Sequence, residues 1–342
     1  MILEIIILVL TLVFIVLASE LFTNGIEWLG QRLELSEGVV GSVFAAVGTA
    51  LPETLIPVVA LLCFGNKHGA EVGIGAIAGA PFMLSTLTLG LCGIALMVYK
   101  ASGRRSDGLN INDVVIKRDL RFFIISYCLA IATSYFSDSA MVRYIMAAVL
   151  VLIYPYYLFH CFKHEGEVGE EPNPLYLDRL FKVGSKKMRA IVPQILLGLA
   201  GITGGAYLFV QSINGLSDDF HIPALVLSLI ISPVATELPE KINSLLWIRA
   251  NKDTLALGNV TGALVFQSCF PVAFGVACTS WHLDAGTRLS GFVAITMALM
   301  YLLLLSAKKL KPQHLAFGAV AYACTIGAII YMDLPAGHLG EH

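Results

Sequence analysis

Two copies of one short phrase carry the residues best suited to chemistry. Residues 49–53 read TALPE and residues 236–240 read TELPE, and each copy lies deep in an apolar stretch. The threonine and the final glutamate are four positions apart, so they share one face of a helix. A proline inside a helix also frees the backbone carbonyl four residues earlier. Each copy therefore offers a carboxylate, a hydroxyl and a backbone oxygen, which are the ligands that hard cations such as Ca²⁺ prefer.

The predicted metal ligands in these two copies are oxygens of those three kinds. They are Gly48, Thr49 and Glu53 in the first copy, and Ala235, Thr236, Glu237 and Glu240 in the second. Gly48 and Ala235 enter through the carbonyls that the prolines free. With the three glutamates and Lys241 ionised, the site carries a net charge of −2, which matches one divalent cation or two protons. The simpler interpretation is a proline kink in which each glutamate pairs with another side chain.

Membrane-spanning helices are the elements predicted to position these residues. The chain of 342 residues is 57% hydrophobic and only 13% charged, whereas about a quarter of the residues of soluble domains are charged. Runs of about 20 apolar residues cross a bilayer as helices. The ten such runs cover residues 2–29, 37–63, 71–98, 121–137, 140–162, 190–213, 222–248, 254–279, 288–306 and 314–332. We therefore expect an all-α polytopic membrane protein with ten transmembrane helices, in which carboxylates within spans mark a functional site.

Composition also limits the partners. The 22 basic and 24 acidic residues nearly balance, so nothing indicates nucleic acid. Seven cysteines are scattered without a CxxC pair, which is typical of small buried side chains. We expect no cofactor, and the predicted partners are inorganic cations and the lipid bilayer.

The ten spans divide into two five-helix repeats. Residues 1–162 form the first repeat, 163–189 a cytoplasmic linker with an acidic patch, and 190–342 the second repeat. An odd number of spans per half predicts an inverted repeat, whose site is expected at the midplane. Of the 22 basic residues, 18 fall in loops on one side and three in the opposite loops, while Lys241 lies inside a span. Because basic loops stay in the cytoplasm, both termini are expected on the non-cytoplasmic side.

A glycine-spaced segment follows each phrase, at Gly75 to Gly79 and at Gly258 to Gly262. Phrase and segment together resemble the alpha repeats of the sodium/calcium exchanger (cation/Ca²⁺ exchanger) superfamily, which carry G-T-S-x-P-E and then a G-N-x-x-G-S-N type segment. The resemblance centres on residues 41–85 and 228–268. It implies a secondary active antiporter that exchanges a divalent cation, Ca²⁺ above all, for Na⁺ or H⁺ by alternating access. It also implies that Asn259 and Gln267 are ligands.

The chain departs from the family pattern at several ligand positions. The serine that follows the threonine is replaced by Ala50 in the first repeat and by Glu237 in the second. The first repeat thus has fewer oxygens, which leaves Mg²⁺ and Mn²⁺ open beside Ca²⁺, because Mg²⁺ keeps several of its waters. Lys241, four residues after Glu237, either forms an intrahelical pair with it or stands where relatives hold a monovalent cation. In the second case it is a charge-coupling residue that favours protons over sodium.

Two other functions compete with transport. Glu53 and Glu240 could form the acid/base pair of an intramembrane enzyme, but the sequence contains neither HExxH nor GxSxG. We therefore expect a transporter and not an enzyme. The acidic patch of the linker is the only sign of a cation sensor that does not transport, and such a sensor would bind cations without exchanging them.

Overall fold

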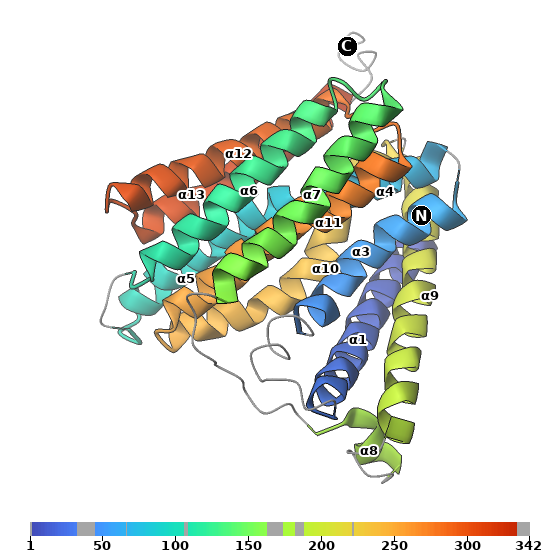
Figure 1. The fold of residues 1–342 in the computed structure, drawn as a ribbon, viewed down its shortest axis with the longest axis horizontal. Helices are drawn as coiled ribbons and strands as arrows, with labels where there is room; N and C mark the ends of the chain where they lie inside the picture. The colour runs from blue at the N-terminus through green and yellow to red at the C-terminus, as the bar shows by residue number, and fades with distance from the viewer. Residues whose placement is uncertain are drawn as a thin grey trace.

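The computed structural model describes residues 2–32, 45–65, 67–105, 109–162, 174–181, 188–220 and 222–333. Within these ranges every regular element is a helix, which confirms the all-α class (Figure 1). The elements are α1 (Ile2–Arg32), α3 (Ala45–Cys63), α4 (Lys67–Met83), the π-helical turn η2 (Leu84–Thr88), α5 (Leu89–Ala101), α6 (Asp113–Thr133), α7 (Ala140–Phe162), α8 (Tyr176–Phe181), α9 (Met188–Phe220), α10 (Ala224–Arg249), α11 (Asp253–Cys278), α12 (Ala285–Ser306) and α13 (Pro312–Asp333).

Each of the ten predicted spans overlaps a helix, although the span at 121–137 runs four residues past the end of α6 and residues 37–44 lie outside the described ranges. Seven helical stretches of the described chain are long and apolar enough to cross a membrane. Helix α6 is not among them because its first turns are charged, and α10 is not because it carries Glu237, Glu240 and Lys241. Helix α3 contributes only the shorter apolar stretch Glu53–Cys63. A count of ten membrane crossings therefore stays a prediction.

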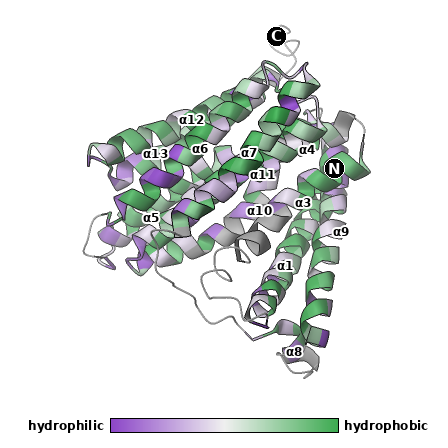
Figure 2. Ribbon diagram, viewed as in Figure 1, coloured by the Kyte–Doolittle hydropathy of each residue, from purple (hydrophilic) through white to green (hydrophobic). Residues whose placement is uncertain are grey.

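The outer helices present large hydrophobic side chains to the surroundings. Leu17 on α1, Leu152 on α7 and Tyr331 on α13 are each at least 60% exposed, and hydrophobic residues run along most of α1, α9 and α12 in Figure 2. A bilayer core is as apolar as these side chains, so their exposure is what an integral membrane protein requires.

Helices α1 and α9 lie side by side (Figure 1), and α3 packs against both of them. A Cβ atom at Gly198 of α9 would overlap the backbone of Phe22, so the glycine lets the two helices approach closely. The fully buried Gln194 then donates hydrogen bonds to Oδ1 of Asn24 at 2.9 Å and to the carbonyl of Leu21 at 3.0 Å.

Helices α4 to α7 and α10 to α13 share one large core in which each half packs on the other. Helix α11 packs against α6 and α7, while α4, η2 and α5 pack against α12 and α13. Ser126 of α6 and Ser268 of α11 join their hydroxyls at 2.6 Å in this core. The two halves are thus interlocked and do not form separate domains.

The glycine-spaced segments behave differently in the two halves. A Cβ atom at Gly75 would overlap the carbonyl oxygen of Leu225, and one at Gly79 would overlap that of Leu229. Helix α4 therefore lies directly on the backbone of α10. At Gly258 and Gly262 the nearest neighbours of an added Cβ are 4.0 Å and 3.6 Å away, so of the two segments only the first packs closely on another helix.

Contacts between loops show which helix ends share a side. The guanidinium of Arg105, after α5, holds both carboxylate oxygens of Asp253 at the start of α11, at 2.7 and 2.5 Å. At the other end of the bundle, Nε2 of His282 lies 3.2 Å from Oδ1 of Asp138. Both contacts join loops that the charge distribution assigns to the same side, although they leave open which side faces the cytoplasm.

The asymmetry of the glycine segments leads to a stability prediction. We expect Gly79→Ala to lower the free energy of unfolding by about 1–3 kcal/mol, because the added methyl group has no room against α10. Gly258→Ala is the matched control, since its methyl group is accommodated and alanine favours a helix over glycine by about 1 kcal/mol. Equilibrium unfolding in mixed micelles measures both. Equal stability of the two variants would contradict the close approach of α4 to α10.

Candidate cation-binding site

The two proline–glutamate phrases lie on α3 and α10, and these helices contact each other. Glu53 is buried on α3, with 6% of its surface exposed. The backbone of Gly48 and Thr49 is helical in α3, and that of Ala235 and Glu240 is helical in α10. Beyond this helical backbone, nothing is described of these four residues. The roles predicted for these four residues therefore stay predictions.

A buried polar cluster links α10 to α11. Glu237 and Lys241 are four residues apart on α10, and Nζ of Lys241 lies 3.4 Å from Oε2 of Glu237. Nε2 of Gln267 on α11 donates to Oε1 of the same carboxylate at 2.8 Å. Lys241 is 5% exposed, and the other two side chains are 2% exposed. Both oxygens of the carboxylate are thus engaged by positively polarised groups, which compensates its removal from water.

The side chains of Thr236 and Asn259 each donate a hydrogen bond to a residue of α10. The hydroxyl of Thr236 donates to the carbonyl of Ser232 at 3.1 Å, and Nδ2 of Asn259 donates to the hydroxyl of Ser244 at 3.1 Å. A hydroxyl that donates one hydrogen bond still has lone pairs, and an amide that donates through nitrogen keeps its carbonyl oxygen. Both residues therefore retain an oxygen that could bind a cation.

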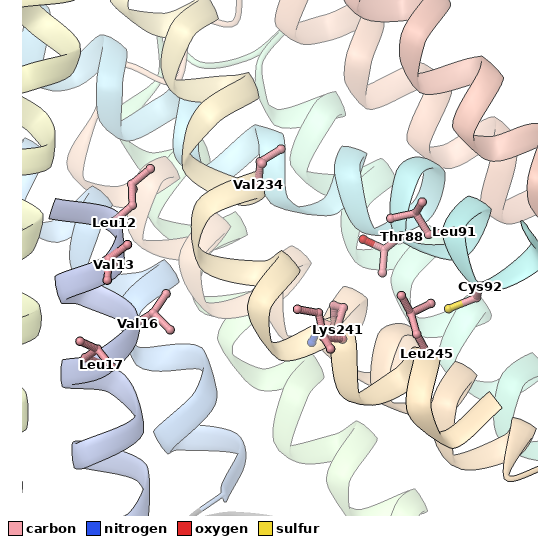
Figure 3. Close-up of a pocket in the computed structure, with 11 residues that line it drawn as sticks. Leu12, Val13, Val16, Leu17, Thr88, Leu91, Cys92, Val234, Lys241 and Leu245 are labelled. Carbon is pink, nitrogen blue, oxygen red and sulfur yellow. The ribbon is translucent and has the colours of Figure 1, made fainter. Parts of the chain in front are cut away.

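A cavity of about 510 Å³ adjoins the cluster. Figure 3 shows residues of α1, among them Leu12 and Val16, on one side of Lys241, and Thr88 with Leu91 on the other. Apart from Lys241, Thr88 and Cys92, the lining is aliphatic. The ammonium of Lys241 therefore stands among largely apolar side chains, as far as the described lining residues show.

Sequence reasoning missed Thr88. Its hydroxyl oxygen is buried and has no hydrogen-bond partner among the described residues. Thr88 ends η2, and π-helical turns of this kind often occur at functional sites. The phrase TALPE lies in α3 and gives no sign of Thr88, although a threonine in the middle of a predicted span was available as a signal. The first half thus supplies a hydroxyl that its altered motif did not indicate.

The structure brings part of the predicted site together. Glu237, Lys241 and Gln267 are in contact, whereas Glu53 does not line the cavity beside Lys241. The described residues contain no group of three or more His, Cys, Asp and Glu side chains that could hold a metal ion. The side chain of Glu240, which carries the third carboxylate of the predicted site, is not among the side chains that the structure describes.

Similarity to known proteins extends over both halves. The family model described as sodium/calcium exchanger protein matches residues 3–163 and 191–331. An uncharacterized membrane protein of Methanocaldococcus jannaschii is 25% identical over 311 residues, which are 91% of this chain and 93% of that protein. The putative antiporter CaxA of Alkalimonas amylolytica is 22% identical over 92% of this chain and 94% of its own length. The crystal structure of an H⁺/Ca²⁺ exchanger superposes with a TM-score of 0.72 at 17% identity, covering 97% of this chain and 87% of that one.

The contact between Gln267 and Glu237 can be tested through stability. Gln267→Leu removes a hydrogen bond to a charged group, so we expect the free energy of unfolding to fall by about 1.5–3 kcal/mol. In a Glu237→Gln background the same change removes only a neutral contact, and the loss falls to about 0.5–1.5 kcal/mol. Unfolding of the four proteins of this cycle gives the coupling energy. Equal losses in the two backgrounds would show that Gln267 does not act on the carboxylate.

Proposed function

The chain belongs to the sodium/calcium exchanger protein family, and from this premise we propose that it is a secondary active cation antiporter. It exchanges a divalent cation, with Ca²⁺ favoured, for Na⁺ or H⁺ across the membrane. The observation that carries this proposal is the buried cluster of Glu237, Lys241 and Gln267 on two packed helices. An ionised pair inside a membrane protein is costly and is retained where ions are bound or moved.

Charge balance explains why such a site exchanges ions. Three glutamates and one lysine leave a net charge of −2 in the proposed site. One divalent cation or two protons neutralise this charge, and the empty site stays highly charged. Moving uncompensated charge through the bilayer is strongly unfavourable. The protein therefore changes its accessible side only when loaded, which couples the two fluxes.

The arrangement of the helices supports alternating access between two inverted five-helix repeats. The last two helices of the first half, α6 and α7, pack against α11, and those of the second half, α12 and α13, pack against α4 and its continuation through η2 and α5, as two related halves would. Helices α1, α3 and α9 share smaller hydrophobic clusters, which also reach residues of α4 and α10 and are distinct from the large core. The cavity lies between α1 on one side and α5 and α10 on the other. A shift of α1, α3 and α9 relative to the helices of the large core would therefore change access to the midplane site.

The choice of Ca²⁺ as the divalent ion of this proposal rests on the oxygens that could bind it. Ca²⁺ takes six to eight oxygens, and the proposed ligands are the carboxylates, the hydroxyls of Thr49 and Thr236, the freed carbonyls and the amides of Asn259 and Gln267. One structural neighbour is named as an H⁺/Ca²⁺ exchanger, while the family name refers to sodium. Both coupling ions therefore belong to the proposal. In this proposal both termini lie on the non-cytoplasmic side, and the linker at 163–189 lies in the cytoplasm.

Removal of the carboxylates tests the function. We expect Glu240→Gln and Glu53→Gln each to weaken divalent-cation binding about 10-fold to 150-fold, because a charge-assisted contact contributes about 1.5–3 kcal/mol. Exchange would be lost while the protein stays folded. The matched control is Asp113→Asn, which removes a partly exposed carboxylate that pairs with Lys117 on the same helix.

Flux into proteoliposomes measures the outcome. Vesicles with an outward Na⁺ gradient at clamped pH are compared with vesicles that have an outward proton gradient and no Na⁺. We expect Ca²⁺ uptake under at least one gradient, with the Asp113→Asn protein close to wild type. Wild-type protein that binds divalent cations but drives no uptake under either gradient would contradict antiport. Full exchange by Glu240→Gln would remove that residue from the site.

A further inference from the structure

The positive charge of Lys241 is not accounted for by the proposed metal ligands. A transporter that binds cations holds, within its own site, a side chain that is itself a cation. The ammonium lies 3.4 Å from Glu237 and is almost fully buried. A buried charge normally needs a partner, and here the lysine supplies the positive charge that Glu237 requires.

We propose that Lys241 is a resident cation, which fills a monovalent-cation subsite beside the divalent site and thereby fixes how many cations the protein binds. This inference rests on the proposed cation exchange and specifies one subsite within it. In the wild-type protein the tethered ammonium takes the place of a mobile Na⁺ ion next to Glu237. The remaining net charge of −2 is then sufficient for one divalent cation.

The surroundings of the ammonium contain the ligands for a small monovalent cation. Glu237 offers a carboxylate, and the carbonyl oxygen of Gln267 is not used in the hydrogen bond that its nitrogen donates. Thr88 lines the same cavity, and its buried hydroxyl has no partner among the described residues (Figure 3). Oxygens of these kinds bind hard cations. Among the described residues that line the cavity, Lys241 is the one with a positively charged side chain.

Removing the ammonium therefore leaves a negative charge that another cation can neutralise. Lys241→Met keeps most of the aliphatic side chain and deletes the charge, so Glu237 stays buried without its ion pair. Leaving a buried charge uncompensated is strongly unfavourable. At pH 8.5, where protons are scarce, a Na⁺ ion from the solution restores neutrality, and the cavity leaves space for it.

The experiment measures Na⁺ binding to the purified full-length protein without requiring transport. Melting is followed at pH 8.5 in NaCl and in choline chloride of equal ionic strength. We expect Na⁺ to raise the melting temperature of Lys241→Met by about 3 °C or more beyond any rise in the wild type, because ligand binding stabilises the folded state. Equilibrium binding of radioactive sodium should show one additional ion per chain. Lys241→Gln, a second neutral variant, should behave in the same way.

Two matched controls separate charge from other effects. Lys241→Arg keeps a positive charge and should show the sodium response of the wild type. The double variant Glu237→Gln with Lys241→Met is neutral at both positions, so it should lose the added response. If both neutral single variants gain no Na⁺ binding, or if the double variant gains as much as Lys241→Met, the proposal is overturned. A carboxyl group that simply takes up a proton would give the first of these results.

The outcome of this test can be told apart from the outcome for the proposed function. Failure of the wild-type protein to exchange divalent cations in proteoliposomes would count against antiport and leave the sodium measurement unaffected. Wild-type exchange combined with unchanged sodium binding in the neutral variants would retain antiport and reject the resident cation.

Discussion

Compensation of buried charge is the constraint that governs the centre of this molecule. A carboxylate cannot remain ionised in an apolar interior unless other groups replace its water. On α10 the spacing of four residues places the ammonium of Lys241 beside Glu237, and α11 brings the amide of Gln267 to the second oxygen. The position of α11 relative to α10 is therefore tied to the charge state of one side chain. A change in that charge would act directly on the contact between two helices.

Close packing of backbones makes this arrangement possible. Gly75 and Gly79 allow α4 to lie on α10, and α4 continues through η2 into α5. The extra residue of a π-helical turn changes the direction in which the following side chains point. Thr88, at the end of this turn, thereby lines the cavity that also contains Lys241. The first half thus reaches the cavity through the helix that follows its motif.

The sequence was sufficient for the pattern of helices and for contacts within one helix. Apolar runs predicted the helices because their length and polarity are local properties, and the Glu237–Lys241 pair followed from its spacing. Contacts between distant segments could not be predicted in this way. The unequal surroundings of Gly79 and Gly258 depend on which helix lies opposite, and the pairing of Arg105 with Asp253 joins residues 148 positions apart. The π-helical turn at Leu84–Thr88 likewise has no local signature as plain as a proline or a glycine.

Fixed charge also explains why the two halves have different ligands. The first repeat carries Ala50 where the second carries Glu237, so the second half holds the additional carboxylate. That carboxylate by itself would raise the charge of the proposed site to −3, which one divalent cation cannot neutralise. Lys241 returns the charge to −2 from within the same helix turn. Glu237 and Lys241 therefore act as a unit, and the gain of one is electrostatically tolerable only with the other. Because a covalently held ammonium never leaves the protein, it would set the charge of the proposed site without taking part in the ionic gradients of the proposed exchange.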